Sequence, residues 1–328
     1  MTPHPERPRL LLIGIQNLLP IAARTFDELG YALLICVPRE HWGIVAQHDL
    51  AALGHEVFQF DGIGSDEVHA RAAEFAPDYI LTIIFGERVP QTFTALAGRL
   101  ALNLHPASLP EFRSGNPWFW PIRKGAVTSA LTVHRLAPRW DAGDILYRHP
   151  FELGPNDTQG IYAERVAANT GPCCIALDQV LRAPEPALEP QPPSPYYPRI
   201  RLRDIAVTWA EEAASITCLV RACNPNHYAE TLFRGLVVQL VQVTPSARRC
   251  DKVWHDDGTQ VRPGDLVVDR SGLFCATGDF FLRIDVVSVH QRLVGTGARF
   301  ASTVGVHKKE RFEDLALDPR FAHLLDRH

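Results

Sequence analysis

The sequence has little that would indicate a disulfide-stabilised or metal-binding protein. Its 328 residues include seven cysteines, an odd number, and no two of them form a C-x-x-C pair or another spacing typical of zinc sites. We therefore interpret the cysteines as reduced and mostly buried, as in a cytoplasmic protein, and we expect no metal site. A redox function of the adjacent Cys173 and Cys174 is a minor alternative.

Long hydrophobic runs are also missing. No stretch approaches the about 20 consecutive apolar residues that a membrane-spanning helix needs. The opening MTPHPERPRLLLIGIQ has a short apolar part and lacks a small-residue cleavage site, so it does not resemble a signal peptide. We interpret it as a polar tail leading into a first strand, and we expect no membrane partner.

The chain has no excess of positive charge and no common nucleotide-binding motif. Lys and Arg number 33 against 37 Asp and Glu, a formal net charge of −4, which argues against a broad nucleic-acid footprint. The predicted first strand-to-helix turn, GIQNLLP (14–20), contains a single glycine instead of G-x-G-x-x-G. G-x-x-x-x-G-K-[ST] is missing too, so we expect neither a dinucleotide site at that turn nor an ATP-binding P-loop.

Apolar, β-rich segments alternate with helical patterns in the first part of the chain. The helical patterns include 18–29 and 66–75, and the predicted strands are 9–15, 31–37, 55–60, 78–84 and 100–104. This alternation predicts a Rossmann-like, mostly parallel α/β sheet with helices on both faces. Further strands are predicted over 128–136 and 145–153. A helix is predicted over 157–182, capped by Asp157 or Thr158 and interrupted at Gly171-Pro172.

A proline-rich segment divides the chain. Residues 183–199 contain seven prolines, which is typical of a semi-rigid extended linker. The predicted domains are therefore 1–182 and 200–328, in keeping with the chain length. After a helix over 211–223, short strands alternate with Gly, Pro and Asp turns, which predicts a small, mainly β domain resembling an OB barrel. A short surface helix is predicted within 308–328.

Three polar residues are candidates for catalysis. Asn103 and His105 alternate at the end of a predicted parallel strand, where open α/β sheets bind ligands. Asp141 follows in the loop WDAGDIL. A carboxylate stabilises a protonated imidazole, and an amide can donate a hydrogen bond to a developing oxyanion. The set suits acyl transfer, and because no Ser or Cys lies in a nucleophile-elbow context, the nucleophile would come from the substrate. Each residue alone also has a structural interpretation, as a hydrogen-bonded strand-end histidine, a turn cap and an Asx-turn residue.

The same stretch carries a family resemblance. NLHPASLPEFR (103–113) followed by DAGDIL (141–146) resembles the catalytic signature of the 10-formyltetrahydrofolate-dependent formyltransferases, N-x-H-x-S-L-L-P and then D-x-G. Asn103, His105 and Asp141 occupy the positions of its catalytic residues. The resemblance is close over about 76–152 and looser in the second domain. The family serine is Ala107 here, which places any role of that serine in doubt.

The resemblance implies 10-formyltetrahydrofolate as co-substrate. FGERVP (85–90) and PRWDAGD (138–144) resemble the two segments that enclose the pterin, and RSGNP (113–117) resembles R-G-x-x-P. We therefore expect folate contacts from Phe85, Gly86, Glu87, Arg88, Val89, Pro138, Arg139, Trp140 and Asp144. Pro117 is predicted to begin a helix bearing three aromatic residues. The expected acceptor site comprises Arg113, Ser114, Gly115, Asn116 and Trp118.

The predicted activity is transfer of a formyl group to a small amine, such as an amino-sugar nucleotide, a hydroxylated ornithine or another specialised-metabolite amine. Formylation of methionyl-tRNA is the main alternative. Methionyl-tRNA formyltransferases typically carry a basic insertion after the second strand and a basic C-terminal domain. The corresponding segment here, VPREHWGIVAQHD (37–49), is short and not basic, and 201–328 hold 17 Lys and Arg against 16 Asp and Glu. Few phosphate contacts would therefore be available, which disfavours tRNA as the acceptor. Hydrolysis of the folate and folate binding without catalysis are further alternatives. If the acceptor is a small amine, the second domain would serve as a scaffold or as the surface of a homodimer.

Overall fold

The computed structural model describes residues 7–15, 17–45, 50–289 and 292–322, which form two compact units. One unit comprises 1–117, 128–153 and 163–198, and the other comprises 118–127, 154–162 and 199–328. These units are defined by packing, and the domain limits 1–182 and 200–328 remain a prediction about the sequence. The N-terminal tail before residue 7 and the end of the predicted C-terminal helix lie outside the described residues.

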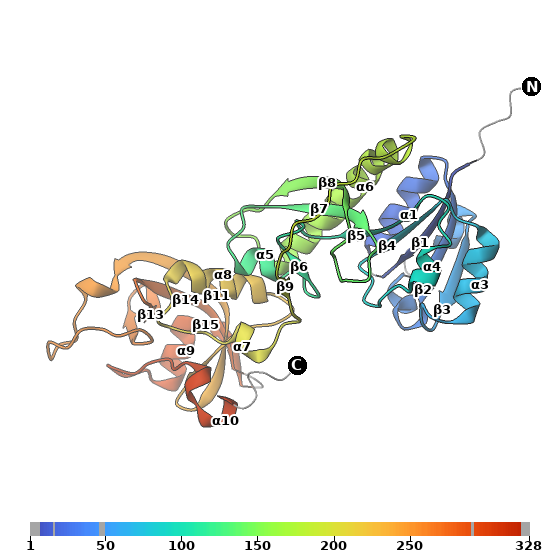
Figure 1. The fold of residues 1–328 in the computed structure, drawn as a ribbon. Helices are drawn as coiled ribbons and strands as arrows, with labels where there is room; N and C mark the ends of the chain where they lie inside the picture. The colour runs from blue at the N-terminus through green and yellow to red at the C-terminus, as the bar shows by residue number, and fades with distance from the viewer. Residues whose placement is uncertain (1–6, 16, 46–49, 290–291, 323–328) are drawn as a thin grey trace, which may run out of the picture. The chain divides into compact units, whose positions relative to one another are not determined.

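The first unit is built on a seven-stranded sheet with the order β3-β2-β1-β4-β5-β7-β8, in which only β7 runs antiparallel to the other strands (Figure 1). The strands are β1 (Arg9–Gly14), β2 (Ala32–Pro38), β3 (Glu56–Phe60), β4 (Tyr79–Ile83), β5 (Leu100–His105), β7 (Thr128–Arg135) and β8 (Ile145–Glu152). The helices are α1 (Leu18–Glu28), α2 (Trp42–Val45), α3 (Asp66–Phe75), α4 (Gln91–Thr94) and, from residue 163 onward, α6 (Gln159–Leu181). The predicted Rossmann-like sheet is confirmed.

Burial explains why the central strands are almost entirely apolar. From Leu10 to Gly14 every residue of β1 is buried, and so is every residue of β4. Side chains of a strand alternate between the two faces, so a strand buried throughout must be covered on both. Val68 and Ala72 of α3 pack on one face in a cluster with Leu11 and Ile13. This rigid centre places the carboxyl ends of β4 and β5 side by side.

Two helix predictions were wrong in detail. The helix predicted to break at Gly171-Pro172 is continuous, and α6 runs through Pro172. A Cβ on Gly171 would meet only the side chains of Thr25 and Ile21, at 3.5 and 3.9 Å, so α6 lies against α1 here. We attribute the continuity of the helix to this packing, because Pro172 has no backbone N–H to donate. The helix predicted to begin at Pro117 is α5, which spans Trp120–Arg123 and has Pro121 in its first turn.

The second unit contains a six-stranded antiparallel sheet with the order β10-β11-β14-β13-β12, and β15 pairs with β14. Its strands are β10 (Ala229–Phe233), β11 (Leu236–Arg249), β12 (Leu266–Asp269), β13 (Gly272–Ala276), β14 (Phe280–Val289) and β15 (Leu293–Thr296). Besides α5, its helices are α7 (Leu202–Ile205), α8 (Ala213–Cys223), α9 (Gly297–Val304) and α10 (Pro319–Ala322). Bridges from Glu313 to Leu232 and from Arg311 to Asp265 connect the two ends of the sheet, as in the expected barrel-like domain.

The proline-rich segment packs along the first unit. Glu189 forms a backbone bridge with Ile145 of β8, and its carboxylate binds Arg148 at 2.6 Å. Farther along, β9 (Tyr196–Tyr197) pairs in parallel with β6 (Arg113–Ser114). Residues 183–198 are therefore held in an extended conformation that crosses the sheet edge near the candidate site. Among the described residues, no helix combines the length and apolar character required to cross a bilayer.

Candidate active site

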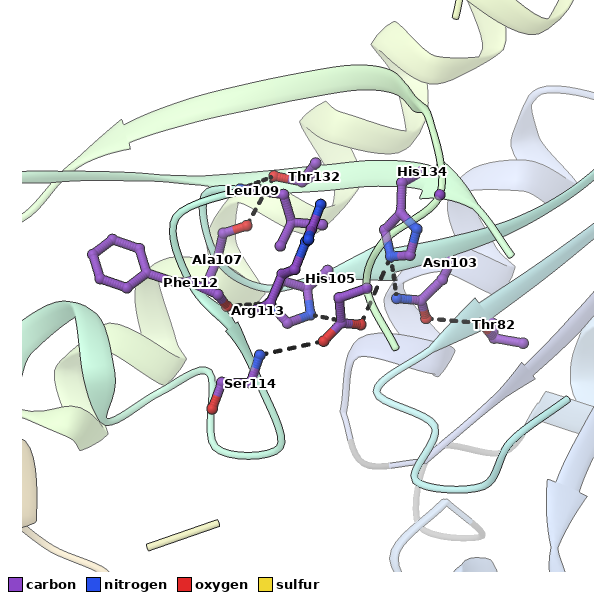
Figure 2. A network of polar contacts seen from close by, with 12 residues as sticks. Thr82, Asn103, His105, Ala107, Leu109, Phe112, Arg113, Ser114, Thr132 and His134 are labelled. Atoms are coloured by element: carbon purple, nitrogen blue, oxygen red, sulfur yellow. Dashed lines mark hydrogen bonds and ion pairs between the residues drawn. The ribbon is translucent and has the colours of Figure 1, made fainter. Parts of the chain in front are cut away.

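Polar side chains form a row across three neighbouring strands. Asn103 of β5 is in register with Thr82 of β4 and lies opposite His134 of β7. Residues opposite each other in a ladder share a face of the sheet, so these three side chains meet. The Thr82 hydroxyl donates to Asn103 Oδ1 at 2.8 Å, and Asn103 Nδ2 lies 3.0 Å from His134 Nε2 (Figure 2).

These contacts determine how Asn103 and His134 are oriented. The carbonyl of Arg135 lies 2.8 Å from His134 Nδ1 and can only accept, so Nδ1 carries the proton. His134 Nε2 then accepts from the Asn103 amide. Asn103 thus has its oxygen held by Thr82 and one N–H held by His134. Its second N–H has no acceptor among the residues that the structure describes, and it is available to a substrate oxygen.

His105 lies two residues farther along the same face, beside Asp141. Its Nε2 donates to the carbonyl of Phe112 at 3.0 Å, and its Nδ1 lies 3.5 Å from Asp141 Oδ1. His105 is buried and Asp141 is half-buried. Because Nε2 already carries a proton, a neutral His105 directs the lone pair of Nδ1 at the carboxylate. The contact becomes favourable when one further proton lies between Nδ1 and Asp141. His105 and Asp141 can therefore act together as a proton-accepting unit.

The loop that carries Asp141 is tightly constrained. Asp141 adopts a left-handed backbone conformation with a φ of 50°, and its Oδ2 accepts from the backbone N–H of Ser114 at 3.3 Å. Gln191, from the proline-rich segment, donates to the carbonyls of Asp141 at 3.1 Å and Gly143 at 2.5 Å. The Gln191 side-chain oxygen accepts from Arg113. Contacts from two distant segments, residues 113–114 and Gln191, therefore hold Asp141 next to His105.

A cavity of about 560 Å³, a size typical of small-ligand sites, is lined by residues that neighbour this group in sequence, although Asn103, His105 and Asp141 do not line it themselves. The predicted folate residues Arg88, Val89, Pro138 and Asp144 line it. Pro90, Ala142 and Gly143 also line it and belong to the predicted segments 85–90 and 138–144. Its remaining lining residues were not predicted from the sequence: Gln91, Thr94, Arg135, Leu136 and Ala137. The two segments expected to enclose a pterin thus face the same space. Arg135 and Ala142 connect it in sequence to His134 and Asp141.

Other predicted site residues have different surroundings. The Phe85 ring packs 6.2 Å from that of Phe60, and the Glu87 carboxylate accepts from the backbone N–H of Ile63. Gly86 lines neither the large cavity nor the smaller one lined by Arg88, Arg113, Arg139 and Trp140. The same holds for Gly115 and Asn116. Trp118 belongs to the second unit, where it packs edge-on against Tyr162, and its contact with an acceptor stays a prediction.

The sequence contained a signal for His134 but none for Gln191. His134 is a lone imidazole in the apolar strand predicted over 128–136, and its importance depends on pairing opposite Asn103. Gln191 lies in a segment whose composition indicates only an extended linker. Among the described residues no group of three or more His, Cys, Asp or Glu side chains could hold a metal ion.

Burial keeps His134 neutral. The residue is 2% exposed, and this burial is the main reason that its pKa falls to about 4. The Asp141 carboxylate opposes the shift, and the neighbouring His105 adds to it. A neutral His134 is required for its Nε2 to accept from Asn103. Because the pKa of His134 differs between the folded and the unfolded protein, this ring makes the free energy of unfolding depend on pH.

We expect the free energy of unfolding to decrease as the pH falls from about 6.5 to about 4. In this window unfolded His134 takes up a proton that the folded ring excludes, so stability rises with pH by at most about 3 kcal/mol. Urea unfolding between pH 4.5 and 7.5 should give a shallower pH slope for His134→Gln than for the wild type. The control is His41→Gln, at a partly exposed histidine, and it should keep the wild-type slope. Parallel curves for His134→Gln and wild type would contradict the prediction.

The sequence profile of the family described as "Formyl transferase" matches residues 44–175, and that of "Formyl transferase, C-terminal domain" matches 199–303. Together these ranges cover most of the chain and contain the polar group described above. The chain therefore belongs to the formyltransferase family.

Curated relatives of the chain include methionyl-tRNA formyltransferases. The one from Salinispora arenicola is 29% identical over 219 residues, which are 66% of this chain and 68% of the relative. The one from Acidithiobacillus ferrooxidans is 28% identical over 262 residues, which are 78% and 80% of the two chains.

Solved structures with the same fold include WlaRD, described as a sugar 3N-formyl transferase, with a TM-score of 0.65 and 13% identity. The match covers 88% of this chain and all of WlaRD. HypX from Aquifex aeolicus has a TM-score of 0.58 and 20% identity, over 90% of this chain and 49% of HypX. This chain thus spans about half the length of HypX. At these identities the likeness concerns the fold.

Proposed function

We propose that the chain transfers a formyl group from 10-formyltetrahydrofolate to the amine of a small molecule, with Asn103, His105 and Asp141 as the catalytic residues. The observation that carries this proposal is the free N–H of Asn103 beside the His105–Asp141 pair, next to a cavity of about 560 Å³. Structural neighbours support the folate: HypX has been solved in complex with tetrahydrofolic acid, and WlaRD in the presence of 5-N-formyl-THF.

The cavity suits a flat, polar ring system. Arg88, Val89 and Pro90 line one side, and Pro138 and Gly143 belong to the other segment. Backbone N–H and C=O groups in such segments can satisfy the donors and acceptors of a pterin. Bound there, 10-formyltetrahydrofolate would supply the formyl group. The predicted contacts of Phe85, Gly86 and Glu87 with the folate would come mainly from the backbone. The Phe85 ring packs on Phe60, the Glu87 carboxylate binds the backbone of Ile63, and glycine has no side chain.

The residues have complementary roles in the proposed reaction. Asn103 donates its second N–H to the formyl oxygen, which gains negative charge as the amine attacks the formyl carbon. The bond from this carbon to N10 would then break, and tetrahydrofolate would leave as N10 takes up a proton. Asp141 and His105 receive the proton that the amine must lose, and a protonated His105 adds positive charge near the oxygen. His134 and Thr82 keep Asn103 in the productive orientation. Gln191 and Ser114 do the same for Asp141.

Formylation of methionyl-tRNA is the second candidate, favoured by the names of the curated relatives. Charge distribution favours the small amine. Basic side chains of the second unit are neutralised locally, as in the ion pairs Arg234–Glu310, Arg249–Asp251, Arg283–Asp285, Lys308–Asp256, Lys309–Asp257 and Arg320–Asp318. This local neutralisation weakens the positive field that would attract phosphates, whose contacts dominate affinity for nucleic acids.

The test is an acceptor panel with 10-formyltetrahydrofolate as the donor. We expect saturable formylation of at least one amine among nucleotide amino sugars, hydroxylated ornithine and related amines, with turnover only weakly dependent on salt. Methionyl-tRNA is assayed in parallel, and binding through several phosphates should weaken steeply with salt, with a slope near about −0.7 to −0.9 per phosphate. Efficient formylation of the tRNA and none of the amines would establish the second candidate. Release of formate without any acceptor would indicate a hydrolase.

A further inference from the structure

A second, smaller cavity of about 230 Å³ lies in the same unit, on the Asp141 side of the polar group. Three arginines and two aromatic residues are among those that line it: Arg88, Arg113, Arg139, Trp140 and Tyr196. Arg139 and Trp140 immediately precede Asp141. Arg113 precedes Ser114, whose backbone N–H binds the Asp141 carboxylate. The cavity is therefore adjacent to the proposed proton acceptor through two different segments of chain.

Arg113 is a buried cation, and among the described residues no carboxylate reaches its guanidinium within ion-pair distance. The residue is 8% exposed, and its guanidinium donates only to neutral groups, the side-chain oxygen of Gln191 at 2.8 and 3.2 Å and the carbonyl of Pro192 at 3.4 Å. Burial lowers its pKa from the ordinary value, and the Asp141 carboxylate opposes this shift from beyond ion-pair distance. Buried charges in proteins are normally paired, because the lost hydration must be compensated. A buried guanidinium at the wall of a cavity indicates that an anion completes the pair.

The other two arginines strengthen this electrostatic preference. The Arg88 guanidinium lies over the Trp140 ring, 5.9 Å from its centroid, and Arg139 repels the charge of Arg113. Over the ranges that the structure describes, no carboxylate lies within 4 Å of any of the three guanidinium groups. Three like charges around one small space raise its positive potential and attract a negatively charged group.

We propose that this cavity binds a carboxylate or phosphate group of the acceptor, so that the enzyme formylates amines that carry such an anion. The inference rests on the proposed function and specifies its substrate class. The acceptor is favoured over the folate as the source of the anion, since the large cavity suits the pterin and the small one lies beside Asp141, where the amine must lose its proton. Trp140 and Tyr196, which are 39% and 45% exposed, offer flat faces to the carbon skeleton of the acceptor.

The first experiment measures binding of inorganic phosphate by calorimetry. Arg139→Gln removes one exposed cation of the cavity, and Arg270→Gln removes an exposed arginine from the turn between β12 and β13 as a matched control. We expect Arg139→Gln to weaken phosphate binding about 10-fold or more, as is common for a lost charged hydrogen bond, and Arg270→Gln to leave it unchanged. Equal phosphate affinity in all three proteins, or none in the wild type, would overturn the anion site.

The second experiment compares matched acceptors. Amino sugars are assayed beside their phosphates, and amino acids beside their carboxamides. We expect a kcat/KM that is about 10- to 100-fold higher for the anionic member of a pair, and Arg139→Gln and Arg88→Gln should remove most of this preference. Equal turnover of anionic and neutral members would overturn the inference and leave the formyltransferase proposal intact. If no amine is formylated while Arg139→Gln still loses phosphate, the anion site stands and the proposed acceptor class fails.

A folate arm excludes the other source of the anion. The affinity of each variant is measured for a folate analogue with its glutamate and for the pteroate analogue without it. We expect Arg139→Gln and Arg88→Gln to change both affinities by the same factor. A loss confined to the glutamate-containing analogue would assign the arginines to the folate tail and overturn the proposal.

Discussion

Asp141→Asn should reduce kcat by about 10²–10³-fold, the usual cost of removing one key electrostatic group from such a site. Asparagine has nearly the same shape as aspartate but carries no charge. The substitution removes the negative charge that faces His105 Nδ1 at 3.5 Å and removes the proposed final acceptor of the amine proton. Because Asp141 does not line the large cavity, the affinity for folate should change little. Steady-state turnover with the amine identified by the panel is the measurement.

The control for Asp141→Asn is Asp61→Asn, which neutralises an exposed carboxylate paired with Arg39 at 2.9 Å. This control should keep normal turnover, since surface ion pairs contribute little. Circular dichroism and the melting temperature establish that both variants are folded. A folded Asp141→Asn enzyme with near-normal kcat would exclude Asp141 from the chemistry.

Asn103→Ala should give a loss of kcat of similar size, because it removes the donor aimed at the formyl oxygen.

Gly143→Ala should lower kcat/KM by about 100-fold through displacement of the catalytic loop. A Cβ at Gly143 would lie 1.9 Å from the carbonyl oxygen of Arg135 and 2.8 Å from its carbon, so the backbone must separate. Arg135 and Asp144, which are joined by a backbone hydrogen bond of 2.9 Å, both line the large cavity. A shift of about 1 Å at a reacting group can cost about 10² in rate. Folate affinity should fall as well, because the cavity wall moves.

Two further variants make the Gly143 experiment decisive. Gly64→Ala adds the same methyl group where no atom lies within 4 Å, and it should be silent. Gln191→Ala releases the loop without adding an atom, because it removes the donor to the carbonyls of Asp141 and Gly143, and it should give a smaller loss. Both kinetics and folate affinity are measured for each. Normal folate affinity and turnover in Gly143→Ala would refute the importance of the close approach to Arg135.

Most of the fold follows from local sequence patterns. The strands predicted over 9–15 and 31–37 agree with β1 and β2 within a residue or two, and α3 coincides with the predicted 66–75. Alternation along one strand also predicted that Asn103 and His105 share a face. Hydrophobic periodicity and capping act within a few residues of one another, which makes them readable from a single chain. Pro172 was misjudged because packing of α6 on α1 supports the helix there.

The sequence by itself determined the mostly parallel α/β sheet, the β-rich second unit, and a strand end that bears an amide and an imidazole. Only the tertiary structure decided which side chains meet them. His134 reaches Asn103 through antiparallel pairing of β5 with β7, and Gln191 reaches the Asp141 loop from 50 residues away along the chain. Strand register and the path of an extended segment depend on contacts between distant residues, and local propensity carries no information about those contacts. For the same reason, the buried charge of Arg113 becomes meaningful only when the cavity around it is known.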